Sequence, residues 1–191
     1  MALNEKLIET EMKLSINRDR PQFFKTFALE NTSSLLNQEK FDKNRPTMLY
    51  GYGYTEKYTS QSTQTIVKSY ITRGDHNIMV VEWSNYSNGN YLFEAIPNAY
   101  KVGEIVGKSL LKMQGEGFNL KSLHLVGHSL GGHLVGFIGR SVYKNSNKTI
   151  KVTRISSLDP AGPFFYGFGE RFQEPITKDD GLNLFQRIFT S

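Results

Sequence analysis

The segment GHSLG at residues 127–131 places a serine between two glycines, each two positions away from it. The residues SLHLV at 122–126 before this segment predict a strand, and the pattern at 130–143 after it predicts a helix. Ser129 therefore stands at a turn from a strand into a helix. A G-x-S-x-G segment in this context presents its serine hydroxyl for chemistry.

The two glycines meet a steric need of such a turn. The chain must turn sharply to lift Ser129 off the strand end, and side chains at positions 127 and 131 would clash there, so Gly127 and Gly131 remove them. The backbone N–H of Leu130 begins the helix and points to where a carbonyl oxygen would gain negative charge. The segment could also be a plain glycine-rich turn or a phosphate-binding loop. Neither the dinucleotide nor the P-loop glycine spacing occurs, which favours a nucleophilic serine.

Strand-like and helix-like patterns alternate along the chain from residue 45 onward. The predicted strands are 47–50, 77–83, 122–126, 151–158 and 183–189, and the predicted helices are 64–72, 99–113 and 130–143. The run NIMVVEW at 77–83 is continuous and β-branched, which is typical of a strand covered on both faces. This alternation predicts an α/β fold with a mostly parallel, doubly wound sheet, whose ligands bind at the carboxyl ends of the strands.

The length of 191 residues favours one domain. We assign residues 45–191 to its α/β core, and residues 1–44 to an N-terminal segment in which the pattern predicts no element. The 23 basic and 18 acidic residues give a formal net charge of +5, and the basic ones are scattered. Scatter of this kind is typical of a solvated surface, so we expect no binding to nucleic acid.

The absence of cysteine excludes disulfides and thiolate chemistry. No window approaches the ~20 apolar residues of a membrane span, so we expect no transmembrane segment. Acidic residues interrupt the first fifteen positions where a secretory signal would need an apolar run, and no signal peptide is predicted there.

Two longer segments resemble the nucleophile and acid segments of the pancreatic lipase family: HLVGHSLGGHLVGFIGR at 124–140 and RISSLDPAGPFF at 154–165. The resemblance extends from about residue 45, through PTMLYGYGYTE and GDHNIMVVEWS, to the chain end. It implies an α/β-hydrolase fold that hydrolyses a lipid ester, a triacylglycerol or a phospholipid, through an acyl-serine intermediate. It also implies an extracellular protein that meets its lipid substrate at a lipid–water interface and needs no metal or organic cofactor.

The resemblance assigns further roles. The acid of the triad corresponds to Asp159, which follows a predicted strand and comes after the serine, as this fold requires. An isolated Asp before Pro is usually a simple turn residue, but the serine turn upstream favours the catalytic role here. The second oxyanion donor corresponds to the backbone N–H of Tyr54. Tyr52 stands where the family usually has histidine, and Gly53 still allows a close approach.

A serine hydrolase of this kind needs a histidine base, which follows the acid in the sequence. The four histidines, His76, His124, His128 and His133, all precede Asp159 and each has a structural interpretation. We therefore expect the catalytic histidine, lid and substrate loops beyond residue 191, and a hydrolase core that is incomplete at its C-terminal end. The alternative is a degenerate, inactive relative that binds or stores lipid. The oligomeric state stays open.

Overall fold

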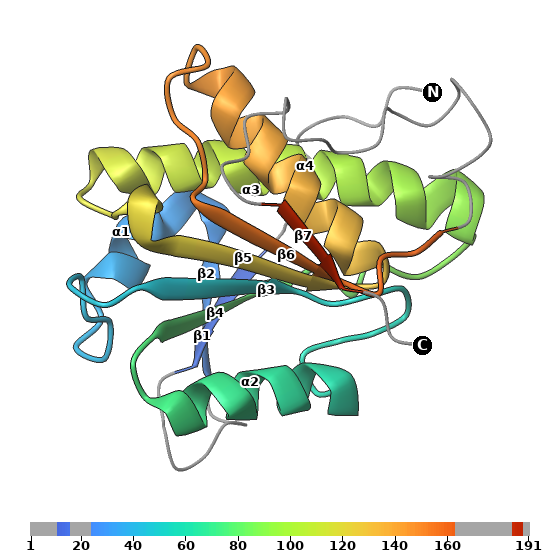
Figure 1. Cartoon of the computed structure of the whole chain (residues 1–191), viewed down its shortest axis with the longest axis horizontal. Coiled ribbons are helices and arrows are strands. Elements are labelled where there is room, and N and C mark those ends of the chain that lie inside the picture. Colours follow the sequence, from blue (N-terminus) through green and yellow to red (C-terminus); the bar gives the residue numbers. More distant parts are fainter. Residues whose placement is uncertain (1–10, 16–23, 163–184, 189–191) are drawn as a thin grey trace.

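The computed structural model describes residues 11–15, 24–162 and 185–188. Within these residues the chain forms a seven-stranded sheet with the strand order β2-β1-β4-β3-β5-β6-β7 (Figure 1). In chain order the strands are β1 (Glu11–Ser15), β2 (Phe24–Ala28), β3 (Thr47–Gly51), β4 (Asn77–Glu82), β5 (Leu123–His128), β6 (Arg154–Leu158) and β7 (Phe185–Ile188).

The larger part of this sheet is parallel. Strands β4, β3, β5, β6 and β7 pair in parallel with their neighbours, whereas β1 pairs antiparallel with both β4 and β2. Strand β3 is buried along its whole length, as expected of a central strand covered on both faces. The carboxyl ends of β3, β5 and β6 meet at one edge of the sheet, and the residues that follow these strands are brought together there.

Helices cover both faces of the sheet. The structure contains α1 (Thr32–Leu36), α2 (Gln61–Arg73), α3 (Ile96–Gly115) and α4 (Leu130–Asn145), with short turns η2 (Leu29–Asn31), η3 (Tyr91–Ala95) and η4 (Leu120–Ser122). Figure 1 shows α3 and α4 together on one face and α2 on the other. This arrangement confirms the predicted doubly wound α/β fold.

The predicted amphipathic helix at 99–113 lies within α3. Its periodic apolar positions, among them Ala99, Val106 and Met113, are all buried, as the spacing required. The helix ends where predicted, in the region of the glycines at 115 and 117. Helix α2 ends at Arg73, one residue after the predicted end, and the next residue, Gly74, takes a left-handed conformation with a φ of 73°, its N–H donating to Tyr70 O.

Some predicted boundaries were wrong. The strand predicted at 151–158 begins only at Arg154, because the residues before it belong to an irregular approach to the sheet. The predicted strand at 183–189 overlaps β7, and its end positions lie outside the described residues. Strands β1 and β2 fall in the N-terminal segment, where the pattern predicted no element, and both join the same sheet as the core strands.

Candidate active site

Ser129 lies at the turn between β5 and α4. It has a φ of 52° and a ψ of −122°, a combination that residues with a β-carbon rarely adopt. Strand β5 ends one residue before it and α4 begins one residue after it. The predicted turn from a strand into a helix is therefore confirmed, and Ser129 lies at the carboxyl edge of the sheet. The N–H of Leu130 is the first of the helix and has no partner within it.

The flanking glycines allow the turn to pack against itself and against β3. A β-carbon at Gly127 would overlap the carbonyl oxygen of Gly131. One at Gly131 would overlap the carbonyl of Gly51, the last residue of β3. Any larger residue at either position would push α4 away from the sheet. These contacts explain why both positions require glycine, as the sequence predicted.

The loop after β3 runs beside Ser129. A β-carbon at Gly53 would lie 3.1 Å from the Ser129 Cβ, so the loop backbone is in contact with the serine turn. The next residue, Tyr54, is anchored away from the turn: its hydroxyl donates to Gly89 O at 2.6 Å, and its ring meets Tyr91 edge-on at 5.0 Å. The structure therefore brings the Tyr54 backbone near Ser129 while its side chain is held elsewhere.

Tyr52, in the position where the family usually has histidine, is fully buried and bonded at its tip. Its hydroxyl donates to Glu82 Oε1 at 2.5 Å and accepts from the Trp83 N–H at 2.8 Å. Its ring stacks on the Trp83 indole, whose Nε1 donates to the Tyr52 carbonyl oxygen at 3.2 Å. Burial, followed by the bond to Glu82, raises the pKa of Tyr52, which remains a neutral donor. These bonds tie the start of the loop to the end of β4.

Asp159 directly follows β6, the strand beside β5. The two strand ends are joined by a hydrogen bond from the Ser129 N–H to Leu158 O at 3.0 Å. Asp159 also has a positive φ, 42°, so the chain turns sharply at both residues. Its negative charge acts on His128, the neighbour of the serine, where it helps to raise the imidazole pKa. The predicted acid is therefore at the same sheet edge as Ser129.

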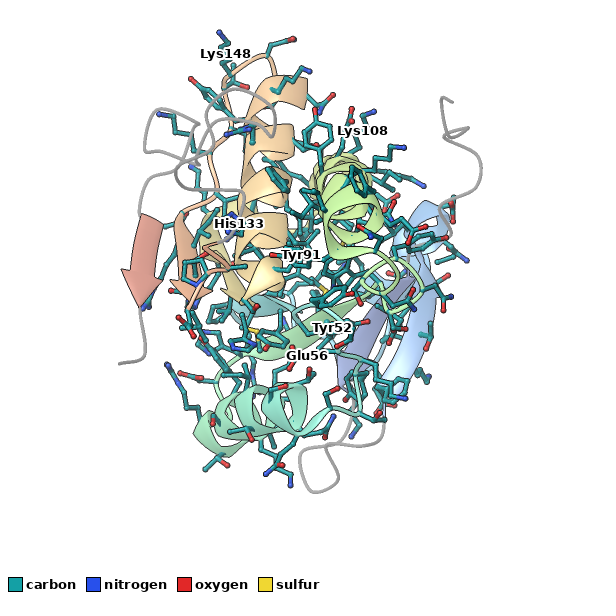
Figure 2. All side chains as sticks on the ribbon, turned by 90° about the vertical axis from the view of Figure 1, so that its right-hand side faces the viewer. Tyr52, Glu56, Tyr91, Lys108, His133 and Lys148 are labelled. Atoms are coloured by element: carbon teal, nitrogen blue, oxygen red, sulfur yellow. The ribbon has the colours of Figure 1, made fainter. Side chains whose placement is uncertain are left out.

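The loop that follows Asp159 is held by the beginning of α4, a feature that the sequence pattern did not reveal. The buried His133, labelled in Figure 2, donates from Nε2 to the carbonyl oxygen of Ala161 at 2.8 Å. Ser157 Oγ donates to Gly132 O at 2.8 Å. Helix α4 thus fixes the backbone on both sides of Asp159, and His133 has a structural partner.

His76, which precedes β4, and His124, near the start of β5, also have hydrogen-bond partners. His76 Nδ1 lies 2.5 Å from the Asp75 carboxylate. The ring of His124 lies between the hydroxyl of Tyr70, 3.1 Å from Nδ1, and that of Ser156, 3.0 Å from Nε2. Burial, together with the positive charge of Arg154 and other nearby cations, lowers the pKa of His124 to about 4.

A carboxylate that the sequence analysis did not single out lies beside the serine turn. Glu56 Oε2 accepts the Gly53 N–H at 2.6 Å, and Oε1 accepts the hydroxyl of Ser62 on α2. Nδ1 of His128 is 3.5 Å from Glu56 Oε2, an ion-pair separation rather than a short hydrogen bond. No short motif announces this contact, because it joins residues more than seventy positions apart.

The electrostatics of this pair favour two charges. Burial alone would raise the pKa of Glu56, but His128, Ser62 and the Gly53 N–H together lower it to about 2. The contact with Glu56 raises the pKa of His128 against the opposing effect of burial, and the charge of Asp159 adds to the rise. An anionic Glu56 therefore faces an imidazole whose protonated form is stabilised.

The sheet order, the helices on both faces and the serine turn after β5 define a protein of the α/β-hydrolase fold. A model of the protein family described as Lipase matches residues 2–180. This chain therefore belongs to the lipase family.

Relatives include Lipase member H of Xenopus tropicalis, 28% identical over 169 residues, which are 86% of this chain and 35% of that protein. Phospholipase A1 member A of Rattus norvegicus is 32% identical over 136 residues, 71% of this chain and 28% of that protein. Pancreatic triacylglycerol lipase of Mus musculus is 29% identical over 143 residues, 74% and 29% respectively. The chain thus spans about a third of the length of these relatives.

Among solved structures, an α/β hydrolase from a Medee basin deep-sea metagenome library is similar with a TM-score of 0.45 and 14% identity. The match covers 96% of this chain and 83% of that one. Across the part of the chain that the structure describes, no helix combines the length and apolar character needed to cross a membrane.

Proposed function

We propose that this protein is a serine hydrolase that cleaves a carboxylic ester of a lipid. The observation that carries the proposal is the turn at Ser129, where a strained serine lies at the carboxyl edge of the sheet, one strand away from Asp159. A carrier that only held lipid would have no need for a serine in a strained backbone conformation next to a carboxylate. Membership of the lipase family points to the same activity.

In the proposed reaction, Ser129 Oγ attacks the ester carbonyl carbon while a base takes its proton. The carbonyl oxygen becomes an oxyanion, which the backbone N–H groups of Leu130 and Tyr54 stabilise. The intermediate collapses, the ester bond breaks, and the base returns the proton to the leaving alcohol. Water then attacks the acyl-serine by the same route, releasing the fatty acid and restoring Ser129.

The base in this proposal is a histidine from sequence outside residues 1–191. None of the four histidines within these residues follows Asp159 in the sequence, the position from which this fold supplies its base. His76 and His124 lie towards the amino ends of β4 and β5, away from the serine turn. Nε2 of the buried His133 donates to the Ala161 carbonyl, and Nδ1 of His128 faces Glu56. Asp159 would orient the incoming imidazole and stabilise its protonated form. In this proposal the catalytic residues are Ser129, Asp159 and that histidine, and the reaction needs no metal or organic cofactor.

We propose a triacylglycerol or a phospholipid as the substrate, since relatives carry the names triacylglycerol lipase and phospholipase A1. We also propose that the protein acts outside the cell at a lipid–water interface, as its resemblance to secreted lipases implies. Three N-x-S/T sequons, at Asn31, Asn85 and Asn147, suit a secreted glycoprotein.

The test uses the full product of the gene that encodes this chain. Hydrolysis of p-nitrophenyl butyrate, emulsified triolein and phosphatidylcholine vesicles is measured for the wild type and for the Ser129→Ala variant. We expect turnover on at least one lipid ester and a loss of at least ~10³-fold in the variant. A fluorophosphonate probe should label Ser129, located by peptide mass spectrometry. Lipid binding without turnover in the wild type would instead support a lipid-binding protein.

A further inference from the structure

The Glu56 carboxylate joins three parts of the structure: the loop after β3, helix α2 and the serine turn after β5. We propose that Glu56 is a positioning residue that holds the Tyr54 loop against the Ser129 turn, so that the N–H groups of Tyr54 and Leu130 face one point. The proposal rests on the proposed function for its effect on catalysis. The contacts themselves are independent of that function.

The first contact fixes the loop. Glu56 Oε2 accepts the Gly53 N–H at 2.6 Å, which is short for a bond to a backbone amide, as expected when the acceptor is charged. The Glu56 N–H in turn donates to Gly53 O at 3.3 Å, so the two residues close a small ring of hydrogen bonds. The Gly53 carbonyl group belongs to this ring and is bonded directly to the Tyr54 nitrogen, which carries the N–H assigned to the oxyanion hole.

The second contact reaches the serine turn. His128 precedes Ser129 directly, and its Nδ1 lies 3.5 Å from the same Oε2 atom. A β-carbon at Gly53 would lie 3.2 Å from Glu56 Oε2, 3.1 Å from the Ser129 Cβ and 3.3 Å from the His128 carbonyl oxygen. The carboxylate, the loop backbone and the serine turn are therefore packed closely at one place, and a β-carbon at position 53 would require its neighbours to shift by a few tenths of an ångström.

The third contact anchors the carboxylate. Ser62, on the first turn of α2, donates to Glu56 Oε1. Helix α2 therefore holds the carboxylate, and through it the loop and the serine turn, in place. The side chains of His128 and Glu56 are 37% and 20% exposed, which leaves their attraction less screened than that of a surface ion pair. Figure 2 labels Glu56 close to the end of the sheet.

The charged and titratable groups that act on this pair are known from the neighbouring elements. The negative charges of Glu56, in the loop between β3 and α2, and of Asp159, after β6, both raise the pKa of the His128 imidazole. Burial raises the pKa of Tyr50 on β3, and the negative charge of Glu56 raises it further, so the phenol stays neutral. The positive partner of Glu56 is therefore His128, and the attraction weakens as pH rises through the raised pKa of that imidazole.

An ordinary loop brace would show some of the same contacts, so the test must separate stability from positioning. In the full gene product, Glu56→Gln removes the charge but keeps an acceptor for the Gly53 N–H, while Glu56→Ala removes both. The matched control is Glu104→Gln, which neutralises an exposed carboxylate 3.0 Å from Lys108 on α3, away from the turn. Ester hydrolysis is measured at a temperature where all variants are folded by circular dichroism.

We expect kcat to fall by about 10-fold in Glu56→Gln and by about 100-fold in Glu56→Ala, with KM within about twofold, because misplaced oxyanion donors affect the transition state alone. The control should retain the wild-type kcat. The wild-type kcat should also show a decline as pH rises above the ordinary histidine range, and this decline should be absent in Glu56→Gln. A kcat for Glu56→Ala equal to that of wild type overturns the proposal.

A second measurement does not depend on hydrolysis. NMR titration of the His128 ring should show a lower pKa in Glu56→Gln, and hydrogen exchange at the Gly53 amide should accelerate by at least about 10-fold in Glu56→Ala. An inert wild type with both changes would refute the proposed function and support the positioning contact. An active wild type whose Gly53 exchange is unchanged in Glu56→Ala would retain the function and refute the positioning role.

Discussion

At the scale of single residues, the backbone conformation of Ser129 lowers the free energy of unfolding. Its positive φ with a ψ of −122° suits glycine and disfavours any residue that carries a β-carbon. We therefore expect Ser129→Gly to raise the free energy of unfolding by about 1 kcal/mol relative to Ser129→Ala. Urea denaturation followed by circular dichroism measures both. The comparison with alanine removes the hydroxyl in each case and leaves the β-carbon as the difference. Equal midpoints for the two variants would contradict this prediction, because the relief of strain would then no more than offset the greater conformational entropy of glycine in the unfolded chain.

A second residue-scale prediction concerns His124. Its pKa of about 4 in the folded protein lies below the ordinary value of 6.5, chiefly because it is buried. Between these pH values the unfolded chain binds a proton that the folded chain does not, so the unfolding free energy contributed by His124 is present above pH 6.5 and is lost as pH falls towards 4. The His124→Gln variant should show a shallower acid loss of stability, by less than about 1.4 kcal/mol per pH unit because the ring is partly exposed.

The control for this prediction is Tyr70→Phe. It removes the hydroxyl beside His124 Nδ1 but keeps the ring buried and titratable. Its unfolding free energy should be lower at every pH, with the wild-type slope between pH 6.5 and 4. Were His124→Gln to keep that slope as well, the acid sensitivity would belong to other groups.

Local rules could predict some of these residues and not others. The glycines around Ser129 were predictable from their motif. The clash that Gly127 avoids is local, with the carbonyl of Gly131, whereas Gly131 avoids the carbonyl of Gly51 on β3. Glu56 was not predictable, since its role depends on a contact with His128 that only the parallel pairing of β3 with β5 creates. The hydrogen bond of His133 to the Ala161 carbonyl is of the same kind, for it needs α4 and the loop after β6 to be packed together.

At the scale of elements, the crossing of α3 and α4 depends on small residues in their contact. A β-carbon at Gly107 would lie 2.5 Å from the Ser141 Cβ on α4, so the helices cannot stay at their present separation. We expect Gly107→Ala to lower the free energy of unfolding by about 1–3 kcal/mol, despite the higher helix propensity of alanine. Chemical denaturation measures the change.

The same helix offers a matched control. A β-carbon at Gly115, the last residue of α3, would meet no atom within 4 Å. Gly115→Ala should therefore be neutral or stabilising by up to about 1 kcal/mol. If both variants raised the midpoint, helix propensity rather than packing would govern α3.

Elements with strong periodicity were predictable, and the two N-terminal strands, β1 and β2, were not. The apolar positions of α3 repeat with helical spacing because one side of the helix lies on the sheet and α4. Strand β2 alternates weakly and is mostly exposed. Strand β1 joins the sheet through antiparallel pairing with β4, a long-range contact that no local pattern signals, and β2 joins it through β1.

At the scale of the whole molecule, the alternation of strands and helices predicted the layers and the edge at which the site lies. Parallel β3, β5 and β6 bring the Tyr54 loop, Ser129 and Asp159 to one sheet edge, although these residues span more than a hundred positions. The alternation did not predict which neighbour each strand would pair with. That order places β3 next to β5, and with it the loop beside the serine.

The last prediction concerns residues 1–191 as an isolated chain. We expect its hydrolysis of p-nitrophenyl butyrate to lie within the residual ~10³–10⁴-fold over the solution rate that binding and an oxyanion hole supply without a complete triad. The reason is that none of its four histidines follows Asp159 in the sequence, the position from which this fold supplies its base. A version extended through a histidine downstream of residue 191 should turn over the ester much faster and should lose this gain in Ser129→Ala. An extended form as inert as its alanine variant would decide for the lipid-binding alternative.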